Sequence, residues 1–161
     1  MSKDELIKLL KEHRENKSRL ELRKLKKKKL EKKLDKLNPI DAESNLSSSY
    51  EINSDIRSKN TISRKIENIV IHKENERESI EKEIRNTEIE IEELEELVKQ
   101  AEIRLNSLYY REREILTAYY VDNREADEIG RNLYFQLYNR TCTAENIYRI
   151  VKKATERIVN L

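Results

Sequence analysis

The apolar residues of this chain recur with the spacing of long α-helices. Between residues 80 and 108 they advance by alternating steps of four and three, which is the heptad period of a left-handed coiled coil. The seam consists of Ile80, Ile84, Thr87, Ile91, Leu94, Val98, Ala101, Leu105 and Leu108. Because such a seam has to be covered by another helix, the pattern predicts a long helix over residues 61–108 that packs against a helical partner.

A second long helix is predicted over residues 4–37. Leucines are spread along it, and no Gly or Pro interrupts it. Asn38 precedes Pro39 and should end the helix, because the residue before a proline avoids the helical region. Residues 38–61 are rich in Ser and Asn, which predicts a polar connector with an optional short helix at 50–58. We expect this connector to be the least ordered part of the chain.

The composition favours helices over other folds, because the chain has few of the residues that tight turns require. Of the 161 residues, 41% are charged, and there is one Gly and one Pro. Sandwiches, barrels and glycine-rich phosphate loops need many more turn residues, so we predict an all-α protein. No apolar run is long enough to cross a membrane, and the first residues lack the apolar core of a signal peptide. These features predict a cytoplasmic protein without a membrane partner.

The charges are segregated along the chain. The first 37 residues contain 15 Lys or Arg against 7 Asp or Glu, whereas residues 73–102 contain 5 against 12. In a parallel homodimer of the acidic helix, Glu83 would face Glu88 of the other chain, and like charges there oppose pairing. A basic helix that folds back on the acidic one removes this conflict. We therefore predict an antiparallel helical hairpin within one chain, and further assembly into a homodimer stays open.

No set of residues has the pattern of a catalytic or metal site. His13 and His72 are far apart and neither lies near Cys142 in the sequence, so we expect no metal, no cofactor and no Cys–His nucleophile. We predict a protein that is not an enzyme. A single cysteine forms no disulfide within the chain, and Cys142 is expected to be a small turn or core residue. The four lysines at 26–29 are either a solvated helix face or a phosphate-binding patch.

Residues 109–161 form the second expected domain, after a helical domain over residues 1–108. Seven of the eight tyrosines and the only phenylalanine lie here, and aromatic side chains supply much of the burial of a small domain. The pattern predicts three or four short helices. Gly130 should allow a close approach of the chain, and Thr141 or Thr143 should cap the last helix with its hydroxyl.

The last predicted helix has an apolar face and a polar face. The apolar residues, at helical spacing, are Ile147, Val151, Ala154 and Ile158. A helix that buries one side and offers Arg, Lys, Asn and Tyr on the other carries the side chains that a reader of the DNA major groove requires. The predicted DNA-contacting residues are Arg140, Thr143, Glu145, Asn146, Tyr148, Arg149, Lys152 and Lys153.

Three short motifs in this segment resemble the promoter-reading helix-turn-helix in the fourth conserved region of sigma factors. They are Glu112 to Leu116, then Glu128-Ile129-Gly130, then Thr143 with Asn146-Ile147 ahead of a basic helix. The helical N-terminal half and the Ser-rich connector are similar in layout to phage late-gene transcription regulators of the ArpU/RinA kind. The resemblance implies a sequence-specific regulator that binds double-stranded promoter or operator DNA in a bacterial host cell and activates phage or prophage late genes with RNA polymerase. The hairpin would then supply dimerisation, a polymerase contact or spacing.

The segment departs from the sigma pattern where residues 134–140 replace a short turn. They are expected either to extend the preceding helix or to form an aromatic loop, with Tyr134, Phe135 and Tyr138 joining the core rather than stacking on bases. Two other functions fit the layout. A DNA-packaging subunit similar to small terminase subunits would form a ring-shaped oligomer, and a coiled-coil adaptor would not bind DNA.

Overall fold

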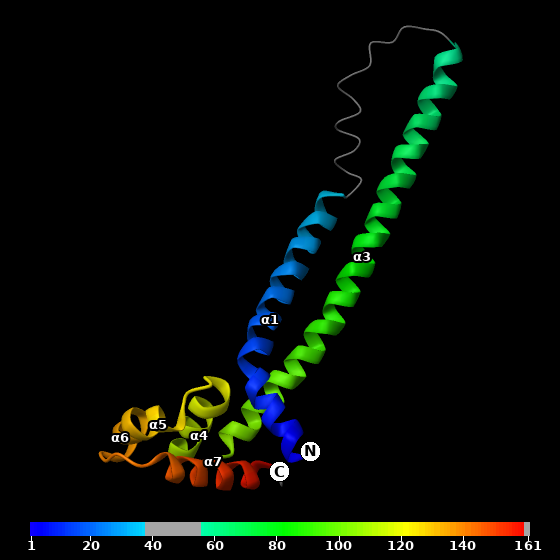
Figure 1. The fold of residues 1–161 in the computed structure, drawn as a ribbon. Helices are drawn as coiled ribbons and strands as arrows, with labels where there is room; N and C mark the ends of the chain where they lie inside the picture. Colours follow the sequence, from blue (N-terminus) through cyan, green and yellow to red (C-terminus); the bar gives the residue numbers. More distant parts are fainter. Residues whose placement is uncertain (38–55, 160–161) are drawn as a thin grey trace. The chain divides into compact units, whose positions relative to one another are not determined.

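The computed structural model describes residues 1–37 and 56–159. Within these residues every element is a helix and none is a strand, so the predicted all-α class is confirmed. The order along the chain is α1 (Lys3–Lys36), α3 (Ile56–Asn106), α4 (Tyr110–Leu116), η1 (Thr117–Val121), α5 (Ala126–Glu128), η2 (Ile129–Leu133), α6 (Tyr134–Tyr138) and α7 (Ala144–Val159) (Figure 1). Residues 38–55 of the expected polar connector, and most of the short helix expected at residues 50–58, lie outside the described residues. Residues 56–61 already belong to α3, so the connector ends and the long helix begins earlier than predicted. None of the described helices has an apolar stretch sufficient to span a bilayer.

The chain divides into two compact units, and both long helices contribute to each of them. Unit 1 comprises Met1–Glu21 with Glu92–Leu161, and unit 2 comprises Leu22–Ile91. These units do not coincide with the two domains expected from the sequence. The reason is that leucines at the start of α1 and residues at the end of α3 share the core of the C-terminal helices.

In unit 2, α1 and α3 form an antiparallel helical hairpin, and Figure 1 shows the two helices running in opposite directions. Basic side chains of α1 reach across to glutamates of α3. The pairs are Arg23–Glu90 at 2.7 Å, Lys26–Glu83 at 2.7 Å and Lys27–Glu88 at 2.8 Å. The pairing of a basic with an acidic helix is the arrangement that the segregation of charge predicted.

The heptad seam of α3 is covered in unit 2. Ile80 and Thr87 are buried, and the seam residues Ile84 and Ile91 are half-buried. Leu30 of α1 is buried as well. The hydroxyl of Thr87 donates to the backbone carbonyl one turn earlier at 2.7 Å, so this polar side chain is satisfied inside the seam. The seam predicted from the sequence is confirmed.

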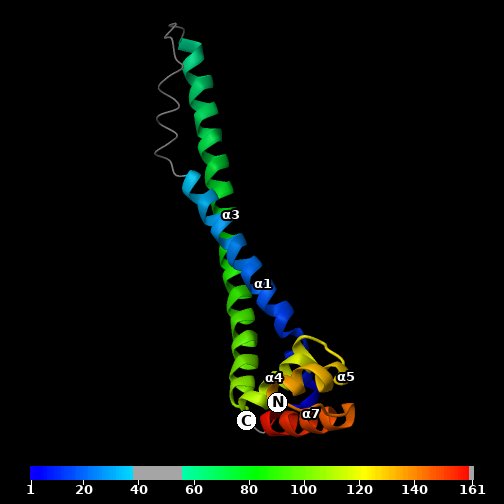
Figure 2. The same ribbon diagram turned by 90° about the vertical axis from the view of Figure 1, so that its left-hand side faces the viewer.

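Unit 1 has a continuous apolar core. Helix α7 packs against α4, α5 and η2, and Figure 2 shows it lying beneath α4 and α5. The start of α1 and the end of α3 complete this core. Its buried members are Leu6, Leu9, Leu10, Ala101, Leu105, Leu108, Ile115, Leu116, Ala118, Tyr120, Ala126, Ile129, Tyr134, Ile147, Val151, Ala154 and Ile158. Residues separated by about a hundred positions in the sequence therefore share one core.

Two turns in unit 1 are wider than those of an α-helix. In η2 the N–H of Tyr134 donates to the carbonyl of Ile129, five residues earlier, and η1 has a bond of the same span at 3.0 Å. Ile129 and Tyr134 are both buried, and so are Ile115 and Tyr120, again five residues apart. The wide turns thus return the chain to the same face after five residues.

Unit 1 also buries two polar side chains of α1, His13 and Asn16. Burial lowers the pKa of His13, with the carboxylate of Glu102 opposing the shift and the ammonium of Lys17 adding to it. Lys17 and Glu102 themselves form an ion pair at 3.1 Å between α1 and α3. The neutral imidazole is therefore the form that the fold favours.

Candidate nucleic-acid interface

Helix α7 has the two faces predicted from its sequence. Ile147, Ala154 and Ile158 are fully buried, and Val151 is buried beside them. Thr155 is also fully buried, and its hydroxyl donates to the Val151 carbonyl at 2.7 Å. The apolar pattern did not identify Thr155, although its place one turn after Val151 was an available signal. This face holds α7 against the rest of unit 1.

The opposite face of α7 is exposed. Arg149 lies roughly opposite the buried stripe, with Lys152 and Lys153 beside it, and none of the three forms an ion pair with a described residue. Glu145 and Glu156 share this face and reduce its net positive charge. The predicted DNA-contacting residues that the structure leaves exposed are Arg140, Thr143, Glu145, Asn146, Tyr148, Arg149, Lys152 and Lys153, which is the whole set.

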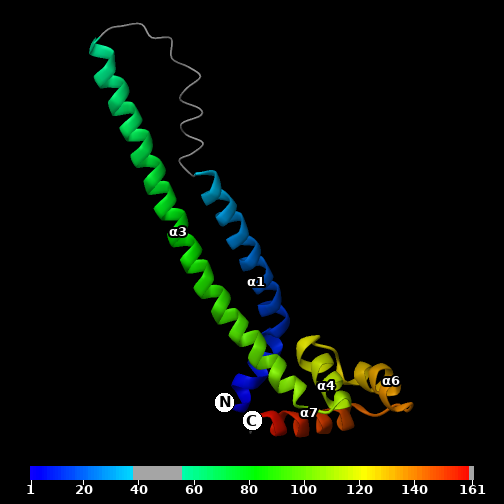
Figure 3. The ribbon, with the colours of Figure 1, turned by 180° about the vertical axis from the view of Figure 1, so that it is seen from behind.

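A short turn leads from α6 into α7, and Figure 3 shows the chain passing from one helix to the other. Asn139 ends α6 in the left-handed region with φ 55°, and its N–H donates to the Phe135 carbonyl at 2.8 Å. The carbonyl of Thr143 accepts from the Ile147 N–H at 3.2 Å. The predicted cap by the hydroxyl of Thr141 or Thr143 is wrong for the described residues. Thr143 begins the helix with its carbonyl instead, and both threonines are exposed.

Gly130 lies where the turn meets the preceding helix. A Cβ atom at Gly130 would stand 2.4 Å from the carbonyl oxygen of Cys142 and 3.7 Å from the Ile147 side chain. The N–H of Cys142 donates to the Gly130 carbonyl at 3.2 Å, so the two backbones are held in contact. The close approach predicted at Gly130 is confirmed. Cys142 is half-buried in this turn, and burial raises the pKa of its thiol, with the charge of Arg140 opposing the shift.

The inserted residues extend the preceding helix rather than forming a loop, since α5, η2 and α6 run together from Ala126 to Tyr138. Tyr134 is in the core and stacks on the ring of Tyr138 at 4.3 Å between centroids. The guanidinium of Arg111 lies 4.5 Å from the centre of the Tyr138 ring. Phe135 is 49% exposed, so its expected place in the core is wrong: it points away from the face that Tyr134 buries.

The carboxyl end of α7 is fixed by arginines of unit 1. Arg157 forms an ion pair with Glu112 of α4 at 2.5 Å. Arg104 of α3 donates to the Ile158 carbonyl at 3.4 Å, where a positive charge complements the negative end of the helix dipole. These contacts anchor the carboxyl end of α7, and buried Ile147 anchors its first turn.

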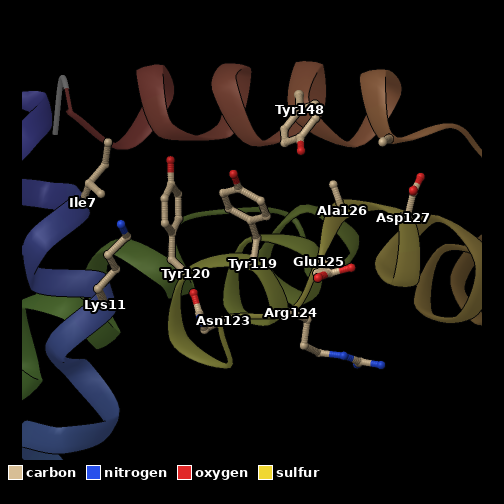
Figure 4. A pocket seen from close by; sticks show the side chains of 11 residues that line it. Ile7, Lys11, Tyr119, Tyr120, Asn123, Arg124, Glu125, Ala126, Asp127 and Tyr148 are labelled. Atoms are coloured by element: carbon tan, nitrogen blue, oxygen red, sulfur yellow. The ribbon is translucent and has the colours of Figure 1, made fainter.

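A groove of about 670 Å³ runs beside α7 in unit 1 (Figure 4). Ile7 and Lys11 of α1, Tyr119 and Tyr120, and Tyr148 of α7 line it. The rings of Tyr119 and Tyr148 meet edge to face at 6.1 Å, and burial, followed by its tyrosine neighbours, raises the pKa of Tyr119. Tyr148 therefore packs partly within the unit while staying half-exposed. Sequence patterns did not identify Lys11 as a neighbour of this site, because only the fold brings α1 to it.

No protein-family model, curated protein or solved structure matches the chain. The likeness to sigma factors therefore depends on the motif residues, which can be located in unit 1, and the likeness to ArpU/RinA regulators depends on the layout of the chain. Glu112 pairs with Arg157, Gly130 meets the turn before α7, and Ile129 and Ile147 lie in the core. Among the described residues, no group of three or more His, Cys, Asp or Glu is placed to hold a metal ion.

Proposed function

We propose that the chain is a sequence-specific DNA-binding transcription regulator without enzymatic activity. In this proposal unit 1 is a helix-turn-helix domain, and the protein activates phage or prophage late genes with RNA polymerase in the cytoplasm of a bacterial host. The observation that supports it is the division of α7, whose apolar residues are buried and whose Arg and Lys residues are exposed. A helix held in this way can present its exposed face to a major groove while its buried face keeps its packing against unit 1.

The exposed side chains of α7 would divide between base edges and phosphates. Arg149 has the donor groups that read the guanine edge. Asn146 has the donor and the acceptor that read the adenine edge. Lys152 and Lys153 would contact phosphates, as would Arg140 at the entrance to the helix. The hairpin of unit 2 would supply dimerisation, spacing or a contact with RNA polymerase.

The direct test is binding of the full chain to duplexes from its own genomic neighbourhood, with footprinting and a salt titration. We expect one protected site. Arg149→Ala should weaken binding to that site by about 1–3 kcal/mol and relax its base preference, as expected for loss of a base contact. Lys152→Ala should weaken binding to every duplex alike and reduce the salt slope by about 1.

Arg131→Ala is the matched control, because Arg131 is an exposed arginine of unit 1 that lies outside α7 and pairs with Asp127 at 3.8 Å. This variant should bind like the parent protein. Absence of a protected site at low salt, or equal losses in the Arg131 and Arg149 variants, would rule the proposal out.

A further inference from the structure

The four consecutive lysines of α1 in unit 2 divide between two faces of the helix. Lys26 and Lys27 form ion pairs with glutamates of α3 at 2.7 and 2.8 Å. The hydrogen bond to Glu88 raises the pKa of Lys27. Successive residues are about 100° apart around a helix, so Lys28 turns away from these pairs, whereas Lys29, three residues after Lys26, lies at the edge of the paired face. Both are exposed.

The outward lysines continue along α1 as a stripe. Lys29, Lys32 and Lys36 follow one another at steps of three and four, so they share one face of the helix. All three are exposed, and none forms an ion pair with a described residue. Of the acidic residues in this part of α1, Glu31 lies 3.8 Å from Lys27, and Asp35 is exposed beside the stripe.

This arrangement costs helix stability unless an anion lies against it. Like charges three or four residues apart on a helix repel one another, and no described acidic side chain forms an ion pair with the lysine stripe. The three ammonium groups extend over roughly 10 Å of helix. Lysine is a compact point charge that binds phosphates without regard to base sequence, and duplex DNA presents closely spaced phosphates over any length.

We propose that Lys29, Lys32 and Lys36 form a second nucleic-acid contact, which binds the phosphodiester backbone of duplex DNA independently of sequence. The contact belongs to unit 2 and does not depend on α7 being a reader of bases. In this proposal the lysine run has both roles: Lys26 and Lys27 stabilise the hairpin through ion pairs, and the outward lysines, which pair with no described residue, contact an external polyanion.

The test is fluorescence anisotropy of the full chain with a short labelled duplex of scrambled sequence, titrated with salt. Replacing all three lysines, with Lys29→Gln, Lys32→Gln and Lys36→Gln together, should lower the slope of log affinity against log salt by about 2.7, at 0.9 per phosphate contact. Arginine at the same three positions should restore it. Circular dichroism of the glutamine variant should show unchanged helix content, since the substitutions remove repulsion on an exposed face.

The matched control removes three exposed lysines that are not on the stripe, with Lys3→Gln, Lys82→Gln and Lys99→Gln. It changes the net charge equally and should leave most of the slope intact. Equal slopes in the stripe variant and the control variant would overturn the inference. It would also be overturned if the stripe variant lost binding to phosphatidylglycerol vesicles but kept its binding to DNA. Failure of this inference can be told apart from failure of the proposed function. The stripe variant should weaken binding to the selected and the scrambled duplex by the same factor, whereas Arg149→Ala should weaken binding to the selected duplex.

Discussion

Unit 1 buries a set of apolar side chains completely, whereas unit 2 joins its two helices with a thin seam and a row of ion pairs. Leu116, Ile129 and Ile147 are fully buried in unit 1, but among the described residues of unit 2 only Leu30, Ile80 and Thr87 are buried. Burying one such apolar side chain is worth about 1.5–3 kcal/mol, while an exposed ion pair contributes about 0–1 kcal/mol and weakens with salt. The two units should therefore respond to different perturbations.

The largest effect is expected in the core of unit 1. Leu116→Ala should lower the free energy of unfolding by about 2–5 kcal/mol, because it removes a fully buried side chain and leaves a cavity. Leu25→Ala in unit 2 is the matched control, since Leu25 is 56% exposed and its loss should change stability by less than about 0.5 kcal/mol. Urea unfolding followed by circular dichroism measures both. Similar losses in the two variants would contradict the contrast between the units.

A smaller loss is expected from Gly130→Ala. In a free helix this change would be favourable by about 1 kcal/mol, since alanine is the better helix former. Here the new Cβ would meet the Cys142 carbonyl at 2.4 Å, so we expect a net loss of about 1–3 kcal/mol. Asn132→Ala, at an exposed position of the same helical segment, should be neutral or stabilising. Thermal unfolding separates the two, and a stabilised Gly130→Ala protein would refute the close contact.

The smallest effect is expected in the ion pairs of the hairpin. Arg23→Gln breaks the 2.7 Å pair with Glu90, whose side chains are both nearly half-exposed, and should cost about 0.2–1 kcal/mol at low salt. High salt should abolish the difference from the parent protein, because exposed charges are screened. Leu116→Ala should keep its full effect in the same salt series. A loss from Arg23→Gln that is independent of salt would mean that packing, not charge, joins the hairpin at this point.

The parts of the fold that follow a regular period could be predicted from the sequence. The heptad seam of α3 and the buried stripe of α7 were identified because apolar side chains on one face of a helix must be covered. The hairpin was predicted from charge, since a basic and an acidic segment remove each other's repulsion. Gly130 was identified because a residue without a Cβ often marks a close approach of two backbones.

What the sequence did not reveal depends on contacts between distant segments or on local departures from the α-helix. From the sequence, Leu6 and Leu10 were assigned to the hairpin. The spacing of apolar residues in their own helix does not indicate that they join the core of the C-terminal helices. Phe135 was assigned to the core by residue type, although the helix turns it outward. The exposure of the six candidate residues on α7 follows from the stripe, but the exposure of Arg140 and Thr143 before the helix and the groove beside Tyr148 do not.

The two wide turns of unit 1 have a consequence for the length of this segment. A turn that holds one residue more than its neighbours lets a helix contain an extra residue while the packing on either side is kept. Removing one residue between Ile129 and Tyr134 should restore ordinary winding and leave Tyr134 four residues after Ile129, which is the same face of an α-helix. Tyr134 would then stay in the core and Phe135 would stay outward, so the wide turn lets this stretch hold one more residue without changing which aromatic ring is buried.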